Sequence, residues 1–463
     1  MISKWHMTGC LCLALSASLM AADVYVDNVK GAVDATGSKE APFKTIAKAL
    51  KVLKSGDTLH LTPNEGVPYE EVIDTHATNA KWGGTAEKPT VIDGHGATIT
   101  GLRHFPAADW KDEGDGVFSR RLHNNAWPMD RQGYWNGHPI VFFDDKPAEF
   151  CKTREALTDR TYFLHKDHPD KRTELHNTLY IKLPAGKTPD DIKVVTIAVR
   201  SILHINRSYV TVKNLTNIYA ADDAFSTTKS SGLIFDNIRG AYCMDQGISN
   251  HGAETVVKNS RFDHNTVSGI VDVYPEAKVK YLNCVVENNN RGGVEFMHGE
   301  YAMENCIIRN NQGTGITVNK NARASLTNCY IENQNSHGVH FGGAGLTMKN
   351  CTIYNSNEAL AMWVDKTPGK FEVTNCAFIN NMWNLNWGKK ADVEPKNIKM
   401  QMNVYTPANF RIFGKEYYPP TWDEYKKTTG LDGDSLMQKY EGALPPYKTG
   451  HKIDDQVIGA DLK

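Results

Sequence analysis

The sequence predicts an all-β protein, a right-handed parallel β-helix whose coils each contain about 23 residues. Three observations support this prediction: a column of regularly spaced cysteines, a longer column of asparagines beside it, and short β-type runs without helical periodicity. The five cysteines recur at intervals of 22 to 25 residues and are Cys284, Cys306, Cys329, Cys351 and Cys376. A period of this length indicates stacked structural repeats.

The asparagine before each of these cysteines extends the same period toward the N-terminus. The column consists of Asn214, Asn237, Asn259, Asn283, Asn305, Asn328, Asn350 and Asn375. A short β-type run follows each asparagine, and many units carry a second run after a glycine, as in GIVDV and GVEFM. Leucine-rich repeats have a similar period, but their leucine signature is absent. We therefore expect coils that stack about 4.8 Å apart.

The two columns have simple structural interpretations. The asparagines are expected to form a ladder of hydrogen-bonded amides at a sharp bend, and the cysteines a stack of small buried residues. Metal binding by the cysteines is the functional alternative, although one cysteine per coil lacks the paired C-x-x-C spacing of a zinc site. Disulfides between adjacent coils are a further alternative that the spacing leaves open.

Composition excludes some classes of function. The 463 residues include 52 Lys+Arg and 53 Asp+Glu, for a formal net charge of -1, so a nucleic-acid binder with a chain-wide basic field is not expected. The chain is long enough to bury a large core alone, and we expect a monomer. Residues 1–22 are typical of a Sec-type signal peptide, with Lys4 before an apolar run that is too short to span a bilayer. We expect a secreted or periplasmic protein with no membrane span.

The chain divides into four further segments. Residues 23–102 are interpreted as an N-terminal cap and the first coils, 103–198 as an inserted β-rich subdomain, 199–397 as the main stack of coils, and 398–463 as a C-terminal capping segment. The cap includes a short amphipathic helix that Gly56 ends, because the apolar residues Ile46, Ala49, Leu50 and Leu53 share one helical face. A helix at this place would cover the open edge of the stack.

The insert is rich in aromatic residues. Its side chains are suited either to stacking on sugar rings or to filling the core of the insert itself. The residues concerned are Trp110, Trp127, Tyr134 and Trp135.

Two stretches of sequence resemble a known superfamily. The opening VYVDN, with DATGSKEAPFKTIAKALKVLKSGDTLHL after it, resembles the start of many secreted bacterial β-helix proteins of the pectin-lyase-like superfamily. The resemblance covers about residues 23–101 and, through the coils, 200–390. The tail around Trp422, Gly430 and Asp432 resembles the terminal segment of such proteins. The resemblance implies a carbohydrate-active protein.

The first candidate site is a group of aspartates. Aligning the second run of each coil on its glycine places Asp222 over Asp245 and Asp223 over Gln246, with His251 close by. Neighbouring coils then separate Asp222 and Asp245 by about 5 Å, which is the carboxyl spacing of retaining glycosidases. Crowding raises the pKa of one carboxyl group, so that one acid stays protonated beside an ionised partner. The alternative is a bend in which aspartates cap backbone amides.

A second resemblance concerns the same residues. The stretch ADD, followed by DQGISNHG, resembles the polygalacturonase-type hydrolases. In those enzymes an aspartate pair and a neighbouring aspartate act on water and on the glycosidic oxygen. The resemblance implies acid/base or supporting roles for Asp222, Asp223, Asp245 and His251.

A second group of polar residues is expected to bind substrate. It contains Arg291, Glu295, His298, His337 and His340. The register places Ser249, Glu295 and His340 in one outward column, with Glu295 and His340 about 10 Å apart across two coils. The guanidinium group of Arg291 is suited to binding the carboxylate of a uronate. The alternative is that these side chains only solvate the outer face of a sheet.

Three functions are compatible with these patterns, all with a polysaccharide or oligosaccharide as the partner. Glycoside hydrolysis by the paired carboxylates comes first and needs no cofactor or metal. The second is β-elimination on a uronate, with Ca²⁺ held by Asp222, Asp223 and Asp245 and with Arg291, His251 or Lys229 as the base. A lyase of this kind would bind a polyanionic substrate. Residues 201–400 carry 19 Lys+Arg and 18 Asp+Glu, so their charge balance does not indicate the basic groove that such a substrate would favour. The third is a non-catalytic glycan-binding protein or adhesin.

Overall fold

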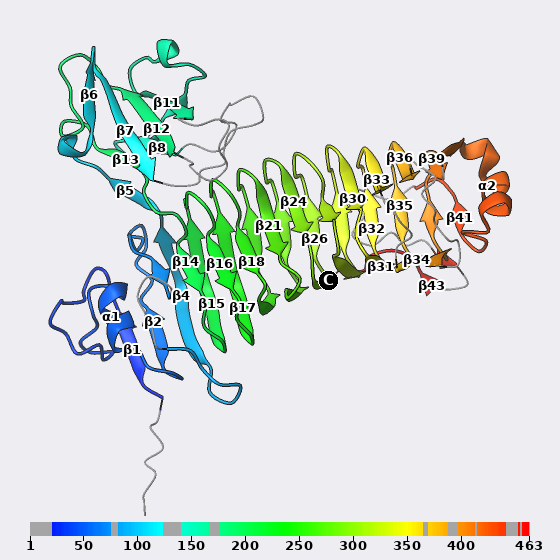
Figure 1. The fold of residues 1–463 in the computed structure, drawn as a ribbon, viewed down its shortest axis with the longest axis horizontal. Helices are drawn as coiled ribbons and strands as arrows, with labels where there is room; N and C mark the ends of the chain where they lie inside the picture. Colours follow the sequence, from blue (N-terminus) through cyan, green and yellow to red (C-terminus); the bar gives the residue numbers. More distant parts are fainter. Residues whose placement is uncertain are drawn as a thin grey trace, which may run out of the picture.

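The computed structural model describes residues 21–75, 82–123, 140–166, 176–363, 369–387, 397–412, 414–440, 452–453 and 456–462. These residues form a long solenoid of parallel strands, from which a smaller β-rich body projects near the N-terminal end (Figure 1). The all-β solenoid predicted from the repeat is therefore confirmed. The signal-peptide prediction rests on residues that lie almost entirely outside this part of the chain. Among the described helices, none combines the length and the apolar character that a membrane crossing requires.

The strands of the solenoid form three faces, and each regular coil of the later part contributes one strand to each of them. We call these the first, second and third faces, in the order in which the chain passes through them. The strands of the third face are β3 (Ile73–Asp74), β14 (Leu203–Ile205), β16 (Phe225–Thr228), β18 (Ile248–His251), β21 (Ser268–Val273), β24 (Gly292–Phe296), β27 (Ile316–Val318), β30 (His337–Phe341), β33 (Glu358–Met362), β36 (Trp383–Trp387), β39 (Asn409–Ile412) and β40 (Lys415–Tyr417). This face carries all of the candidate residues except those in the bends beside it.

The first and second faces are continuous in the early coils and separate in the later ones. Strands that extend through both faces are β4 (Thr90–Thr100), β15 (Val210–Ile218) and β17 (Leu233–Ala241). The first face also contains β1 (Asp23–Val26), β2 (Thr58–Leu61), β19 (Glu254–Lys258), β22 (Lys278–Leu282), β25 (Glu300–Glu304), β28 (Arg323–Thr327), β31 (Gly345–Lys349), β34 (Lys370–Thr374) and β37 (Ile398–Gln401). The second also contains β20 (Arg261–Asp263), β23 (Val285–Glu287), β26 (Ile307–Arg309), β29 (Tyr330–Glu332), β32 (Thr352–Tyr354), β35 (Ala377–Ile379), β38 (Val404–Tyr405) and β41 (Leu436–Met437).

The asparagine column marks the bend between the first and second faces. Every one of its eight members has a positive φ, between 51° and 57°. Asparagine tolerates this left-handed conformation better than most residues because its short side chain bonds locally. Amides of neighbouring coils also bond to each other, as Asn328 does to Asn305 at 2.7 Å and Asn237 to Asn214 at 2.9 Å. The predicted ladder is present at these positions, whereas the Asn259 amide donates to Asp236 instead.

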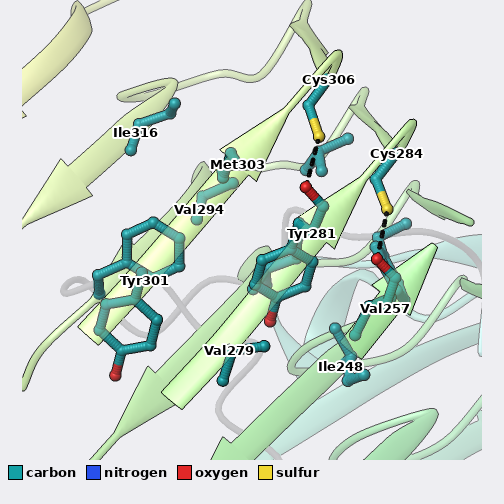
Figure 2. Packing of buried hydrophobic residues seen from close by; sticks show 14 of the residues in the cluster. Ile248, Val257, Val279, Tyr281, Cys284, Val294, Tyr301, Met303, Cys306 and Ile316 are labelled. Atoms are coloured by element: carbon teal, nitrogen blue, oxygen red, sulfur yellow. Dashed lines mark hydrogen bonds between the residues drawn. The ribbon is translucent and has the colours of Figure 1, made fainter. Parts of the chain in front are cut away.

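The cysteine column lies inside the solenoid. All five cysteines are buried, and each thiol donates to backbone carbonyls. Figure 2 shows Cys284 and Cys306 among Tyr281, Val294 and Met303. The seven cysteines of the described residues are all free, and neither group of metal-capable side chains found there includes a cysteine. The simple interpretation as small core residues therefore fits, and the disulfide alternative does not.

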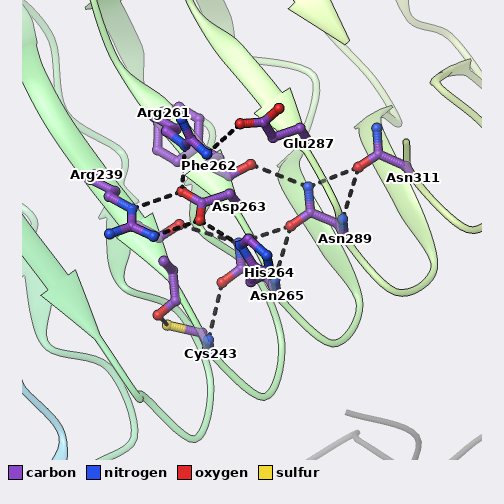
Figure 3. Close-up of polar contacts among 12 residues, drawn as sticks. Arg239, Cys243, Arg261, Phe262, Asp263, His264, Asn265, Glu287, Asn289 and Asn311 are labelled. Carbon is purple, nitrogen blue, oxygen red and sulfur yellow. Dashed lines mark hydrogen bonds and ion pairs between the residues drawn. The ribbon is translucent and has the colours of Figure 1, made fainter. Parts of the chain in front are cut away.

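Polar ladders also lie at the bend between the second and third faces. The amides of Asn265, Asn289 and Asn311 bond in sequence at 3.0 and 2.9 Å (Figure 3). Beside them Asp263 accepts from Arg239 and His264, and these bonds hold the pKa of Asp263 below its usual range although burial opposes them. Such ladders satisfy buried polar groups while they fix the register of neighbouring coils.

The body at 102–197 consists of two antiparallel-rich sheets. Its strands are β5 (Leu102–His104), β6 (Lys111–Gly114), β7 (Val117–His123), β8 (Val141–Phe143), β9 (Lys146–Pro147), β10 (Glu149–Phe150), β11 (Thr161–Lys166), β12 (His176–Lys182) and β13 (Val194–Ile197), with short 3₁₀ turns at Ala107–Asp109 and Arg154–Ala156. Trp110 is buried in the core of this body. Trp127, Tyr134 and Trp135 lie outside the described residues.

Helices stand near the two ends of the solenoid. Helix α1 (Ile46–Val52) buries Ile46, Ala49 and Leu50 and contacts β1. Helix α2 (Trp422–Thr429) follows a 3₁₀ turn at Pro419–Thr421 and ends at Gly430, whose φ is 70°. The last strands are β42 (Lys452–Ile453) and β43 (Gln456–Val457). A capping role for both terminal segments stays a prediction.

Candidate functional site

The aspartates lie in bends that precede two neighbouring strands of the third face. Asp222 and Asp223 come before β16, and Asp245 comes before β18, whose first residue pairs with that of β16. Stacked backbone bonds fix the two bends, because the Asp222 amide donates to the Arg200 carbonyl at 2.8 Å and the Asp245 amide to the Asp222 carbonyl at 3.3 Å. The predicted placement of Asp222 over Asp245 is therefore confirmed.

The three carboxyl groups converge on one point. One oxygen each from Asp222, Asp223 and Asp245 lies within 4.8 Å of the other two. Arg200 Nε donates to Asp222 Oδ2 at 2.8 Å, and the Gln246 side-chain amide donates to Asp245. The Arg200 guanidinium offsets the negative charge on Asp222. The cluster thus combines an ion-paired carboxylate with two carboxyl groups that have no cationic hydrogen-bond donor among the described residues.

Burial and crowding change the protonation of two members of this cluster. Burial raises the pKa of Asp223 well above its usual value, and the charges of Asp222 and Asp245 raise it further. Burial and the neighbouring Asp222 likewise raise the pKa of Asp245. Asp223 is only 3 % exposed, and its Oδ1 has no hydrogen-bond partner among the described residues. Burial and the neighbouring negative charges therefore favour the protonated forms of Asp223 and Asp245.

A pocket of about 380 Å³ opens beside Asp222 and Asp223. His251 lines it at the far end of β18, and Asp74, Arg200 and His204 line it from earlier coils. Burial lowers the pKa of His251, although the charge of Asp222 opposes the shift, so the imidazole is neutral near pH 7. The structure thus brings His251 to the same pocket as the acids.

Three lining residues of this pocket were not found by sequence reasoning. Asp74 pairs in register with His204, with His204 Nδ1 3.6 Å from the Asp74 carboxylate, although the inserted body separates the two in the chain. Arg200 comes directly before the first regular coil of the long stack. The signal that could have found them was the coil register itself, continued backward across the insert.

The two arginines nearest the acids belong to one stacked series of bends. Backbone bonds connect Arg200 to Asp222, Asp222 to Asp245, Asp245 to Val267, and Val267 to Arg291. Arg291 is exposed two coils after Asp245, and its positive charge lowers the pKa of Asp245, whereas the charge of Glu295 raises it. A cation therefore stands on each side of the acid group along the axis of the solenoid.

The second group of predicted residues is only partly assembled. Strand pairing places Ser249, Glu295 and His340 in one column, as the sequence predicts. His337 lies 5.4 Å from His340 between ring centroids, and His337 Nε2 lies 3.3 Å from Glu358 Oε2. Burial and His337 lower the pKa of His340 to about 4.

His298 stands apart from the others. It lies in the bend between β24 and β25, and its Nδ1 is buried without a hydrogen-bond partner among the described residues. Glu295 accepts from Ser268 at 2.8 Å, and Glu358, which sequence reasoning did not single out, accepts from Asn386 at 2.9 Å. Two polar groups thus lie along the third face. The first is the group of acids, and the second, several coils further on, is a histidine–glutamate group that consists of His337, His340 and Glu358.

Comparison with known proteins agrees with the architecture. Residues 273–404 match the family described as right handed beta helix region, and residues 29–72 match a family described as a protein of unknown function, DUF1565. No curated protein matches the sequence.

Solved structures resemble the chain in fold. The structure of XylC in complex with xylose is 13% identical, covers 91% of this chain and 87% of its own, and superposes with a TM-score of 0.57. The pectate lyase Pel9A is 14% identical over 82% of this chain and 79% of its own, with a TM-score of 0.47. A glycoside hydrolase is 10% identical over 90% and 95%, with the same TM-score. The chain is a right-handed parallel β-helix protein.

Proposed function

We propose that this chain is a glycoside hydrolase that acts on a polysaccharide or oligosaccharide. The observation that carries the proposal is the convergence of the carboxyl groups of Asp222, Asp223 and Asp245 within 4.8 Å, beside a pocket. Paired carboxyl groups in different protonation states are what glycoside hydrolysis requires. The xylose held by XylC, which shares this fold, supports a sugar as the ligand.

The separation of the carboxyl groups favours hydrolysis with retention. In retaining enzymes the two groups are about 5–5.5 Å apart, whereas inverting enzymes need about 6.5–9.5 Å to admit a water. One oxygen of Asp222 lies within 4.8 Å of one oxygen of Asp245, which is nearer to the shorter class than to the longer one. Asp245, whose pKa is raised, gives its proton to the glycosidic oxygen as that bond breaks, and Asp222, paired with Arg200, forms the bond to the anomeric carbon. Water then releases the sugar and returns the proton to Asp245.

The other residues have supporting roles in this proposal. Asp223 is buried beside the pair, and burial together with the charges of Asp222 and Asp245 raises its pKa, which favours an uncharged carboxyl group that adds no further negative charge to the site. His251 is neutral and bonds to Ser249 at 3.3 Å, where it lines the place for a sugar. Arg291, Glu295, His298, His337 and His340 are assigned to substrate binding along the third face.

The test compares Asp245→Asn with Asp115→Asn on a panel of polysaccharides. Asp245→Asn removes the proton donor and is expected to lower kcat by about 10²- to 10⁴-fold. Asp115 is exposed in the insert, and its variant is expected to keep full activity. Proton NMR of the first product shows whether the anomeric configuration is retained. Full turnover by Asp245→Asn would contradict the proposal, as would binding without turnover by the unmodified chain, which identifies a glycan-binding protein.

A Ca²⁺-dependent lyase is the second candidate, and one observation favours it. The unpartnered Oδ1 of buried Asp223, beside two further carboxyl groups, fits a hard cation with oxygen ligands. Asp222, Asp223 and Asp245 would hold the ion, which would neutralise a uronate carboxylate, while His251, Arg291 or Lys229 removes the neighbouring proton. Ultraviolet absorbance of unsaturated products, lost on addition of a chelator, would identify this reaction, whereas the hydrolase keeps its activity with chelator.

Export is part of the proposal because a glycan substrate would be met outside the cytoplasm. The support is the N-terminal sequence pattern that ends near Ala22. N-terminal sequencing of the protein recovered from outside the cytoplasm is expected to begin at residue 22 or 23. A chain that keeps Met1 and stays in the cytoplasm would contradict export.

A further inference from the structure

A second group of metal-capable side chains lies on the first face, near the N-terminal end that is blue in Figure 1. It consists of His60, Asp93 and His95, on strands β2 and β4. Tyr25, His60 and Asp93 stand in one register column across β1, β2 and β4. The acid cluster of the third face shares none of these residues.

A local insertion brings His95 into this group. Lys213 on β15 pairs with Asp93, and Leu215 pairs with Ala97, so that Gly94, His95 and Gly96 stand opposite the single residue Asn214. His95 has a φ of 50°, an unfavourable value for a residue with a side chain, and its amide donates to Asp93 Oδ1 at 3.0 Å. Bulges of this kind redirect a side chain, and strain of this kind gathers at functional positions.

The two imidazole rings meet edge to edge. His60 Nδ1 and His95 Nε2 are 2.8 Å apart, the ring centroids are 5.1 Å apart, and the planes differ by 17°. Carboxylates lie at both outer nitrogens, with Asp23 Oδ1 3.1 Å from His60 Nε2 and Asp93 Oδ1 3.6 Å from His95 Nδ1. A carboxylate favours an N–H at the nitrogen it faces. At His60 this leaves the Nδ1 lone pair directed at His95 Nε2, so the two facing nitrogens can share a hydrogen bond or coordinate one cation.

We propose that His60 and His95 bind a divalent transition-metal ion of the zinc class. Imidazole nitrogens prefer zinc, copper and nickel, whereas calcium and magnesium prefer oxygen ligands. Asp23 and Asp93 supply the carboxylates that orient metal-binding histidines from outside. Asp93 also lies close enough to offer an oxygen to the ion.

The surroundings suit an ion that enters from solvent. The His95 side chain is 45 % exposed, and a pocket of about 520 Å³ beside both histidines leaves room for water ligands. Lys213, which pairs with Asp93 at 3.0 Å, offsets part of the negative charge. Because Asp23 is on β1, His60 on β2 and His95 on β4, a bound ion ties together three neighbouring strands at the start of the solenoid.

The experiment is a calorimetric titration of the tag-free, chelator-treated chain with Zn²⁺. We expect one ion whose binding is lost in His60→Gln and in His95→Gln. Asp23→Asn, at an exposed residue, is expected to weaken binding about 10- to 100-fold without affecting folding. His165→Gln, an exposed histidine of the insert, and Asp245→Asn in the other cluster serve as controls and are expected to bind Zn²⁺ as the unmodified chain does.

Two further measurements complete the test. Bound Zn²⁺ is expected to raise the melting temperature of the unmodified chain, and this shift is lost in Asp23→Asn at low Zn²⁺. Ca²⁺ and Mg²⁺ are expected to give neither heat nor a shift through these residues. Absence of Zn²⁺ binding, which would leave the two rings joined only by their hydrogen bond, overturns the proposal. Binding that persists unchanged in both histidine variants also overturns it.

Discussion

Asp245 lies between two charged side chains of opposite sign. The charge of Arg291 lowers its pKa and that of Glu295 raises it, while burial and Asp222 make the largest upward contributions. If Asp245 is the proton donor, the basic limb of the pH profile of kcat/KM follows its pKa, since the reaction needs the protonated form.

This arrangement predicts opposite shifts from two single substitutions. Arg291→Gln removes the positive charge, so the basic limb is expected to move to higher pH by about half a unit. Glu295→Gln is expected to move it to lower pH by a similar amount. The profiles are measured on the same substrate, with Arg323→Gln on another face as the control. Shifts in one direction for both variants would show that another group controls the limb.

Residue positions within the regular coils were predictable from sequence because each coil adds one residue to each column. The stacking of Asp222 on Asp245 and of Glu295 below His340 needed only the repeat length. The protonation states of the aspartates could not be predicted in this way, because they depend on the burial of each carboxyl group and on which of them pairs with Arg200. His298 illustrates the limit: it follows Glu295 closely in sequence, but it lies in the bend after β24 and not on the strand that carries Glu295.

Strand β21 carries a carboxyl group into the interior of the solenoid. Asp272 is fully buried and accepts bonds from Tyr281 Oη at 2.8 Å and from Asn250 at 2.7 Å. Burial outweighs these bonds and raises the pKa of Asp272 to about 7. Between about pH 4, where an unfolded aspartate titrates, and pH 7, the folded chain holds a proton that the unfolded chain releases.

The free energy of unfolding therefore falls as the pH rises through this window. Asp272→Asn keeps the shape of the side chain and removes the titration. We expect the free energy of unfolding in urea to fall between about pH 5 and about pH 7 by about 2 kcal/mol more in the unmodified chain than in the variant. Asp115→Asn is the control. Equal pH dependence in Asp272→Asn and the unmodified chain would mean that Asp272 does not hold this proton.

The asparagine bends allow the backbone and side-chain contributions to be separated. Asn305 has a φ of 55°, donates to Asn283 at 3.3 Å and accepts from Asn328 at 2.7 Å. Asn305→Ala loses the ladder bonds and places a methyl group in a left-handed conformation, at an expected cost of about 1–2 kcal/mol in unfolding free energy. Asn305→Gly loses only the bonds and is expected to cost less. Equal losses in urea unfolding would assign the whole effect to the bonds.

Elements outside the regular repeat were the hardest to predict. The pairing of β3 with β14 joins residues separated by the inserted body, and the extra residues of β4 around His95 interrupt the period. A pattern search at fixed spacing passes over both. The pocket residues Asp74 and His204 and the histidine pair of the first face were missed for this single reason.

At the scale of the whole molecule, the two ends of the stack need protection. A parallel solenoid ends in a strand whose outer backbone groups are unpaired and can join another chain. Near the C-terminal end, buried Asp432 accepts from Ser435 at 2.7 Å, from Tyr425 on α2 at 2.8 Å and from Asn403 at 3.0 Å. One side chain thus connects the terminal helix to the last coils.

Asp432→Ala is expected to release this end and to make the chain self-associate. The expected result is a lower melting temperature together with dimers or larger species in size-exclusion chromatography with light scattering. Asp432→Asn keeps an acceptor for the tyrosine and serine hydroxyls, so it is expected to remain closer to the unmodified chain. A monomeric, equally stable Asp432→Ala would show that the segment around α2 does not protect the edge.

The stacking of coils fixes the spacing of residues along the third face. Because every coil advances by about 4.8 Å, the distance between the acids and the histidine–glutamate group can change only by a whole number of coils. Duplication or deletion of one coil between β18 and β30 would lengthen or shorten the reach along a glycan by one step and leave the chemistry at Asp222 and Asp245 untouched. A protein of this fold can therefore adapt to substrates of different length through the number of its coils, while the residues at the site of bond cleavage stay unchanged.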